Sequence, residues 1–168
     1  IAFNSVNLKI NQILSRNENT GKALAKMANA TYIKNITQIQ PTSLIVICVN
    51  DDNIESVVNT LPNQMMVHTS GSVSMDVFKN KQEYGVIYPV QSLTKNTKIN
   101  FQDVPICVEA NSQSIEKKLI KLTQKISNNV KLLDSKNRQQ LHLAAVVACN
   151  FSNYCYLIAK NILEQKNI

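Results

Sequence analysis

Residues 43–61, SLIVICVNDDNIESVVNTL, decide the predicted fold. The run 43–49 is continuous and β-branched, and turn-forming residues bound it at Pro41 and at 50–52. This pattern is typical of a strand that is covered on both faces, as in a parallel sheet. A short helix is expected to follow over 53–61, capped by a polar residue at its start. A buried strand followed by a helix predicts an α/β fold.

The same alternation extends along the chain. Further strands are expected at 8–16, 30–35, 64–70, 84–93 and 104–110, and helices at 17–28, 114–127 and 135–165. Pro89 predicts that strand 84–93 lies at an edge or leaves the sheet there. We therefore predict a Rossmann-like parallel sheet over 1–111. The start of an all-α dimerisation and substrate domain is expected over 112–168, with the boundary between 112 and 134.

Composition limits the classes of partner. The formal charge is +7 over 168 residues, but the lysines are scattered, which favours a solvated surface over a nucleic-acid site. Four cysteines form no CxxC pair and no zinc spacing, so no metal is expected, and they are interpreted as buried free thiols. No secretory signal or uninterrupted apolar stretch of membrane-spanning length is apparent. We expect a cytoplasmic protein without a nucleic-acid or membrane partner.

Small polar residues follow three of the expected strands. They are Ser15-Arg16-Asn17, Asn50-Asp51-Asp52 and the five residues from His68 to Ser72. The carboxyl ends of parallel strands meet at one edge of a sheet, where ligands bind beside helix N-termini. The three groups therefore predict a ligand crevice along one rim.

The residues of this rim allow more than one interpretation. His68 could bond a substrate or cofactor amide, act as an acid or base, or be a hydrogen-bonded structural residue. Gly71 permits close backbone approach, and the hydroxyl of Ser70 offers a hydrogen bond. Ser15 with Arg16 would favour a ribose 2′-phosphate, or Arg16 is a surface residue at a helix start.

Asp51 and Asp52 are interpreted as helix caps rather than as acid-base catalysts. The long helix 135–165 carries a polar stripe at helical spacing, formed by His142, Cys149, Asn150 and Asn153. Asn amides on an otherwise apolar helix need partners. The stripe therefore either bonds another helix in a bundle or dimer, or lines the substrate side of the crevice.

Four stretches resemble a known bacterial family in this order: VHTSGSVSMDVF (67–78), YGVIYPVQSL (84–93), PICVEA (105–110) and RQQLHLAAVVACNFSNYCYLIA (138–159). The family comprises Rossmann-like proteins with a C-terminal helical domain of unknown function. Its members are described as candidate NADP oxidoreductases, related to pyrroline-5-carboxylate reductase and to the 6-phosphogluconate and 3-hydroxyacid dehydrogenases.

The resemblance implies a place for each candidate residue. His68, Ser70 and Gly71 would lie at the nicotinamide end of a cleft that binds NADP. Tyr88, Pro89 and Gln91 would lie beside it, with Gln91 and Asn153 toward the substrate. His142 and Asn150 would lie on the helix that closes the substrate pocket. Ser15 and Arg16 would contact the adenosine ribose or its phosphate, with Asn50 and Asp51 also on the cofactor side.

The chain departs from this family at its ends. Such proteins begin with a strand and a glycine-rich turn that holds the pyrophosphate, whereas IAFNSV (1–6) would already belong to the following helix. The family also carries further helices after the position of Ile168. We therefore expect a member that is incomplete at both ends and lacks the first strand and the glycine-rich turn.

The expected function is an NAD(P)-dependent oxidoreductase that acts on a small carbonyl or imine. His142 or His68 would supply or take the proton, and Asn150 would orient the substrate. A homodimer through the C-terminal helices is expected. The alternatives are a non-catalytic dinucleotide-binding or dimeric scaffold protein and, with less support, a nucleic-acid partner.

Overall fold

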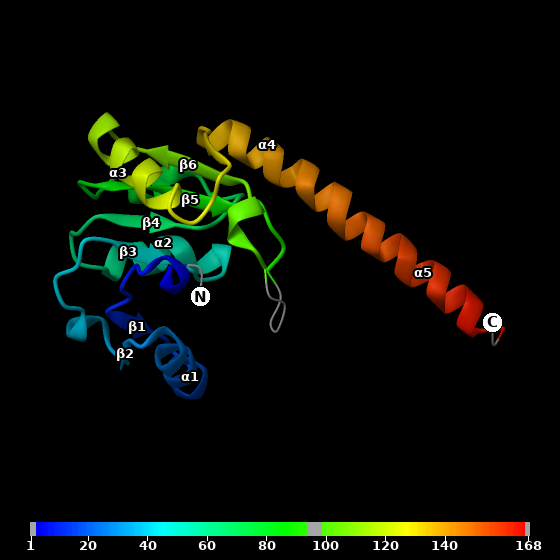
Figure 1. Cartoon of the computed structure of the whole chain (residues 1–168), viewed down its shortest axis with the longest axis horizontal. Coiled ribbons are helices and arrows are strands. Elements are labelled where there is room, and N and C mark those ends of the chain that lie inside the picture. The colour runs from blue at the N-terminus through cyan, green and yellow to red at the C-terminus, as the bar shows by residue number, and fades with distance from the viewer. Residues whose placement is uncertain (1–2, 94–98, 167–168) are drawn as a thin grey trace.

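The structure is a computed structural model that describes residues 3–93 and 99–166 (Figure 1). Its strands are β1 (Gln12–Leu14), β2 (Thr31–Ile33), β3 (Ile45–Ile47), β4 (Met66–His68), β5 (Tyr84–Pro89), β6 (Ile106–Ala110) and β7 (Val130–Leu132). Its α-helices are α1 (Glu18–Ala28), α2 (Ile54–Thr60), α3 (Gln113–Thr123), α4 (Ser135–Val146) and α5 (Ser152–Glu164). Short 3-10 turns of three or four residues lie at Asn4–Val6, Ile36–Gln38, Asp51–Asn53, Met75–Phe78 and Phe101–Asp103.

The main sheet has five strands in the order β3-β4-β5-β6-β7. The pairs β3–β4, β4–β5 and β6–β7 are parallel, and β5–β6 is antiparallel. The Rossmann-like α/β fold is thus confirmed, with β6 and β7 running opposite to β3, β4 and β5. The expectation of an edge position for β5 is wrong, because β5 lies at the centre. Pro89 nevertheless ends this strand, as the sequence allowed, at its pairing with Ile106.

Strands β1 and β2 form a separate two-stranded parallel sheet connected by α1. Among the described strands, none pairs with the second edge of β1 or with the second edge of β3. In a Rossmann sheet of order 3-2-1-4-5-6, β2, β1, β3, β4 and β5 occupy places 3, 2, 4, 5 and 6. Among the described strands, the gap therefore lies at place 1.

Local sequence explains the helix ends. Asn17 caps α1, because its side chain accepts a hydrogen bond from the backbone N–H of Thr20, and Asn29 ends the helix in the left-handed conformation. Ser112 caps α3 in the same way. The apolar face of α3 packs on β5 and β6, where Ile115 and Leu119 are fully buried.

A second layer of core lies between α2 and the other face of the sheet. Ile54, Val58 and Phe78 are buried there against Ile47 and Met66. Burial of each such side chain contributes about 1.5–3 kcal/mol of transfer free energy. These two layers pack against both faces of β4. They therefore fix the position at which the turn after β4 begins.

Helix α3 and strand β7 belong to the sheet unit rather than to the projecting helix. Strand β7 pairs with β6, and Asp134 then caps α4 by accepting a hydrogen bond from the backbone N–H of Asn137. The chain therefore leaves the sheet at the upper limit of the predicted boundary interval, 112–134. The strand β7 was not predicted.

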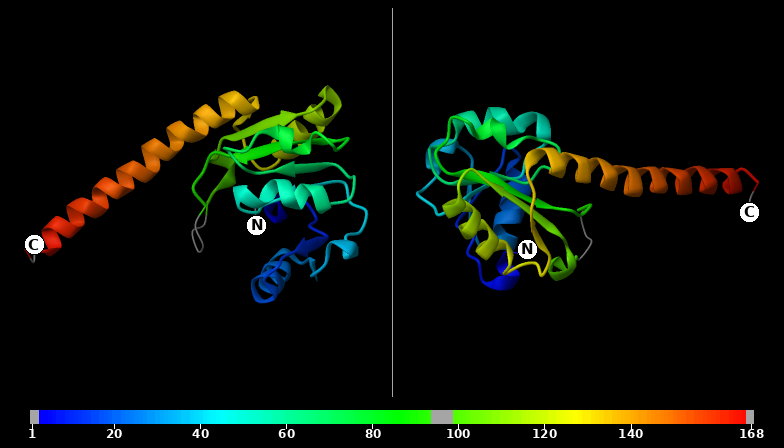
Figure 2. Two further views of the ribbon diagram at one scale, coloured as in Figure 1. Left: turned by 180° about the vertical axis from the view of Figure 1, so that it is seen from behind. Right: turned by 90° about the horizontal axis from the view of Figure 1, so that it is seen from above.

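The long helix was predicted over 135–165 and runs through α4, a π-helical segment at Val147–Phe151 and α5. It projects from the sheet unit in every view, with its far end clear of the rest of the chain (Figures 1 and 2). Ser135–Glu164 is long and apolar enough to cross a membrane by length and composition. No part of its most apolar window is buried within the chain.

The cysteines are placed differently from the expectation. Cys107 is buried in β6, as predicted, but Cys48, Cys149 and Cys155 are exposed. Cys48 lies just beyond the end of β3, and the other two lie on the projecting helix, where no other element covers them. Among residues 3–93 and 99–166 no group of three metal-ligating side chains converges.

Candidate active site

A polar contact between the central strand of the sheet and the long helix joins Tyr88 to His142. The phenolic oxygen of Tyr88, on β5, lies 3.0 Å from Nδ1 of His142, on α4. The two rings meet edge to face with centroids 5.8 Å apart. Burial raises the pKa of Tyr88, so the phenol stays protonated at neutral pH and can donate to the free lone pair of a neutral imidazole. In that state the ring proton of His142 is on Nε2, which leaves a donor for a ligand.

Gly71 completes this contact from the side of the main sheet. A Cβ atom on Gly71 would lie 2.5 Å from Nδ1 of His142 and 2.7 Å from Cζ of Tyr88. The turn after β4 therefore lies flat against both rings, which only a glycine permits here. His142 is half-buried, and the sequence prediction that the long helix turns this residue toward the end of β4 describes its position.

The turn after β4 is tightly bonded within itself. The hydroxyl of Ser70 accepts hydrogen bonds from the backbone N–H groups of Ser72 and Val73, at 3.1 Å each. Ser72 donates its hydroxyl to the carboxylate of Asp51, which lies beyond β3. The predicted meeting of the ends of β3 and β4 on one rim is thus present. Asp51 makes this contact instead of capping α2. The sequence predicted Asp52 or Asn53 as the cap, and the N-cap residue is Asn53, without a side-chain capping bond, so the interpretation of Asp51 and Asp52 as caps is wrong.

His68 is fully buried below this turn rather than open to a ligand. Its ring stacks on Phe78 with centroids 5.4 Å apart, and its Nδ1 accepts a hydrogen bond from the backbone N–H of Ser70. Burial, with a further effect from the positive charge of Arg138, lowers the pKa of His68 to about 4. His68 is therefore neutral at physiological pH, and its contacts are those of a structural residue that supports the turn.

Arg138 supports the same turn from the helix. Its side chain is 0% exposed, although it carries a charge. Nη1 donates to the carbonyl oxygens of Ser70, Gly71 and Val73 at 2.8–3.1 Å. Nη2 donates to the carboxylate of Glu109 and the hydroxyl of Ser135 at 3.1 and 2.9 Å.

From the sequence, Tyr88 was predicted only to lie beside the cleft, and Arg138 was not predicted to be a site residue. One signal for Arg138 was available, because it precedes His142 by four residues and hence lies on the same face of the helix. The partner of Tyr88 depends on how β5 and α4 meet in space. No spacing along the chain encodes that contact.

The remaining candidates lie apart from this cluster. Ser15 follows β1, where its hydroxyl donates to the backbone oxygen of Asn17, and Arg16 beside it is exposed. Both lie at the carboxyl end of the separate small sheet, and no described hydrogen bond joins them to the end of β3 or β4. Asn50 is exposed before Asp51, and Gln91 is exposed just beyond β5.

Asn150 and Asn153 lie farther along the projecting helix and are exposed. The predicted stripe assumed an uninterrupted α-helix from His142. The π-helical segment inserts an extra residue into one turn, which changes the phase of later residues by about 100°. Among His142, Cys149, Asn150 and Asn153, His142 is the residue that contacts the turn after β4.

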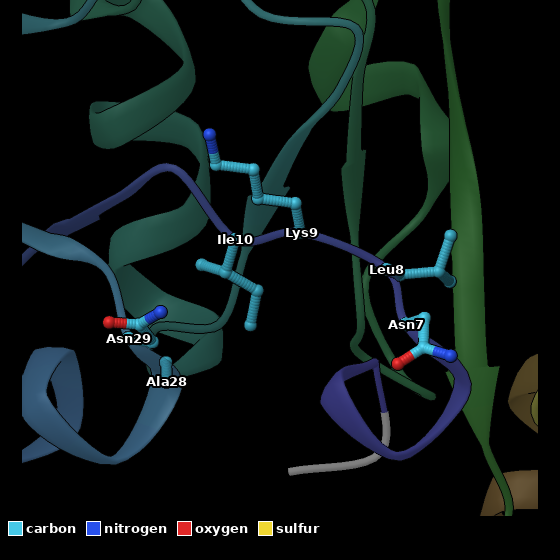
Figure 3. A pocket seen from close by; sticks show the side chains of 6 residues that line it. All are labelled: Asn7, Leu8, Lys9, Ile10, Ala28 and Asn29. Carbon is cyan, nitrogen blue, oxygen red and sulfur yellow. The ribbon is translucent and has the colours of Figure 1, made fainter.

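A solvent-open hollow of about 360 Å³ lies elsewhere, before the amino ends of β1 and β2. Figure 3 shows its lining side chains, which come from two segments: Asn7, Leu8, Lys9, Ile10, Ala28 and Asn29. Because ligands of α/β sheets bind beyond the carboxyl ends of strands, this hollow is not the predicted crevice.

Comparison with solved structures identifies the family. A candidate NADP oxidoreductase from Bacteroides fragilis is 32% identical over 99% of this chain and 67% of its own length, with a TM-score of 0.89. This chain belongs to the same family of Rossmann-like candidate NADP oxidoreductases.

The family resemblance extends to more distant structures. A Thermotoga maritima protein is 25% identical with a TM-score of 0.74, and the chain covers 64% of its length. An imine reductase from Myxococcus stipitatus, solved with NADP⁺, is 15% identical with a TM-score of 0.70 and 62% of its length covered. That likeness shows the fold alone. The chain spans about two thirds of the length of these proteins.

One sequence family also matches part of the chain. Residues 104–168, from just before β6 to the C-terminal end of the chain, match the family described as a domain of unknown function, DUF2520. No functionally curated protein matches this chain in sequence. Membership of the oxidoreductase family therefore depends on the structural relative.

Proposed function

We propose that this chain forms the greater part of an NAD(P)-dependent oxidoreductase that reduces a small carbonyl or imine compound, with His142 as the proton donor. The family membership supports the class of reaction. The contact between Tyr88 and His142 carries the assignment of the proton donor, because it fixes an imidazole beside a glycine turn at the end of a parallel strand.

The residues present fit a nicotinamide at this place. Gly71 lets the turn pack directly against the rings of His142 and Tyr88, and the hydroxyls of Ser70 and Ser72 lie in the same turn, where we propose that the nicotinamide approaches. When bound, the nicotinamide supplies the hydride. His142 would then give its Nε2 proton to the substrate oxygen or nitrogen while the Tyr88 hydroxyl passes its proton to Nδ1, so that the imidazole stays neutral and the phenol regains its proton from solvent.

His142 is proposed in preference to His68. A proton donor must reach the substrate, and His142 is half-buried whereas His68 is fully buried with its Nδ1 bonded to Ser70. The lowered pKa of His68 also leaves it without a proton to donate as an imidazolium at neutral pH. Asn150, Asn153 and Gln91 remain candidates for orienting the substrate.

The cofactor proposal concerns NADP in particular. Ser15 and Arg16 follow the strand at place 2 of the sheet, where an acidic residue would bond a ribose 2′-hydroxyl and an arginine accommodates a 2′-phosphate. We propose that Arg16 binds this 2′-phosphate. Asn50 and Asp51 would lie on the side of the rim that faces the adenosine of the cofactor. The pyrophosphate itself would need a turn supplied by the strand at place 1.

We also propose a homodimer through the projecting helix. Six large apolar side chains follow one another at spacings of three or four residues and are each at least 42% exposed: Leu143, Val147, Phe151, Tyr154, Ile158 and Ile162. We refer to these six residues as the apolar stripe. A helix with such a stripe is stabilised by packing against an equivalent helix. A cytoplasmic dimer with neither a membrane nor a nucleic acid as partner is the state that we propose.

The decisive experiment uses the full-length protein with NADPH and a panel of small ketones, aldehydes and cyclic imines. Turnover is expected, and His142→Ala should lower kcat by about 100-fold or more while NADPH binding stays within about twofold. Lys136→Gln, an exposed change on the same helix, serves as the matched control. Tight NADPH binding without turnover on any substrate would instead favour a non-catalytic dinucleotide-binding or scaffold protein.

A further inference from the structure

The guanidinium of Arg138 connects three segments that are distant in sequence. It bonds three backbone carbonyls of the turn 70–73, the carboxylate of Glu109 on β6 and the hydroxyl of Ser135 at the start of its own helix. A fully buried arginine is costly unless its charge and its donors are matched. Here Glu109 provides the opposite charge beside Nη2 and three carbonyl oxygens accept from Nη1, whereas Nε has no hydrogen-bond partner among the described residues.

This set of bonds fixes the turn as well as the helix. Three carbonyl oxygens point to one nitrogen, so the backbone 70–73 must wrap around the guanidinium. Gln139 adds a bond from the same helix to the carbonyl oxygen of Ser72, and Ser135 accepts a bond from the backbone N–H of Met75. The start of α4 is thus attached to the turn at several points, whereas α5 is exposed along its length.

Arg138 and His142 lie four residues apart, hence on one face of α4. The bonds of Arg138 therefore determine where the ring of His142 lies above Gly71 and how it meets Tyr88. We propose that Arg138 is a positioning residue that holds the turn 70–73 and His142 in register, so that Tyr88 can select the proton-donating tautomer. The effect of this register on catalysis rests on the proposed function. The relative placement of the turn 70–73 and His142 does not.

The shape of the guanidinium is the essential property, because a fork can reach the carbonyls and the carboxylate at once. Lysine at this position keeps the charge beside Glu109 but places a single ammonium where two nitrogens are needed. Arg138→Lys therefore separates positioning from charge balance. A role in charge balance alone predicts that this variant behaves like the wild type.

The test combines nitrogen NMR of the His142 ring with kinetics on the full-length protein. The wild type and Lys136→Gln should show an unprotonated Nδ1 and a protonated Nε2. Arg138→Lys should show both tautomers in exchange, with kcat lowered about tenfold or more and the Kd for NADPH within about threefold, since a small misplacement costs rate more than binding. A cooperatively folded Arg138→Lys with the wild-type ring spectrum would overturn the proposal.

Two further arms keep the outcome decisive. If Arg138→Lys fails to fold, Ser135→Ala removes one acceptor from Nη2, and a smaller change of the ring spectrum in the same direction is expected. An unchanged spectrum in Ser135→Ala would then overturn the positioning role. If the wild type neither binds NADPH nor turns over a substrate, the proposed function fails, but the ring spectra still decide whether Arg138 sets the register.

Discussion

The phenolic oxygen of Tyr88 and Nδ1 of His142 are 3.0 Å apart, and this contact joins the central strand of the sheet to the helix that projects from it. It relates two residues that are 54 positions apart in the chain. It also places a protonated phenol against an imidazole, the side chain most often used in acid-base chemistry near neutral pH.

Removing the hydroxyl tests this contact directly. Tyr88→Phe should lower the free energy of unfolding by about 1 kcal/mol, the net value of one hydrogen bond, and should allow both tautomers of His142. The free energy is measured by urea unfolding and the tautomers by nitrogen NMR. Tyr84→Phe on the same strand is the matched control, because Tyr84 stacks on Phe78 and does not contact His142. Equal effects of the two changes would contradict the prediction.

Gly71→Ala should disturb the site through space rather than through backbone conformation. Gly71 has no positive φ, but its added Cβ would overlap His142 and Tyr88. We expect a loss of about 1–3 kcal/mol in the free energy of unfolding. In a His142→Ala background part of this loss should be recovered, which a double-mutant cycle measures. Strict additivity of the two changes would show that the rings are not in contact with the turn.

The buried His68 predicts a dependence of stability on pH. Its pKa is about 4 in the folded protein and near 6.5 when unfolded, so the unfolded chain binds the extra proton first as the pH falls. The stabilisation is complete above about pH 7 and is lost between about 6.5 and 4, by up to about 3 kcal/mol. Urea unfolding at pH 7.5 and pH 4.5 measures it, and His68→Gln should remove this component. The same pH dependence in the variant would assign it to other groups.

The apolar stripe predicts the oligomeric state. Phe151→Lys with Ile158→Lys places two charges on a face that is more than 40% exposed at each of these positions, and should convert the dimer to a monomer. Light scattering after size exclusion measures the mass. Lys160→Gln, outside the stripe on the same helix, should leave the dimer intact. A wild type that is monomeric at all concentrations, or that requires detergent, would contradict the proposed dimer.

Much of the fold could be predicted because the strands are apolar runs with clear ends. The run 43–49 was correctly assigned, as were α1 and the long helix, since capping residues and helical spacing are local properties. The direction of β6 was not predictable, because an antiparallel partner needs no crossover helix and the intervening segment carries no distinct pattern. Strand β7 was missed because VKL is short and mostly exposed at the sheet edge.

The site was predicted only in part. The glycine turn and His142 were found from residue types at a strand end and on a helix face. The burial of His68 follows from the position of β4 between β3 and β5, where its three residues are all buried, and that position is a tertiary property. The contacts of Tyr88 and Arg138 arise where distant segments meet, so no pattern along the chain specifies them. The π-helical segment was likewise not predicted, because the helical spacing assumed a regular α-helix.

The length of the long helix means that a movement at its base is amplified at its far end. Its thirty residues from Ser135 to Glu164 span about 45 Å, and its base is held at Arg138, beside the turn. A tilt of about 10° at the base moves the tip by about 8 Å at that length. A small rotation of the helix base, at the turn beneath His142, would therefore cause a much larger displacement of any partner bound to the outer half of the helix.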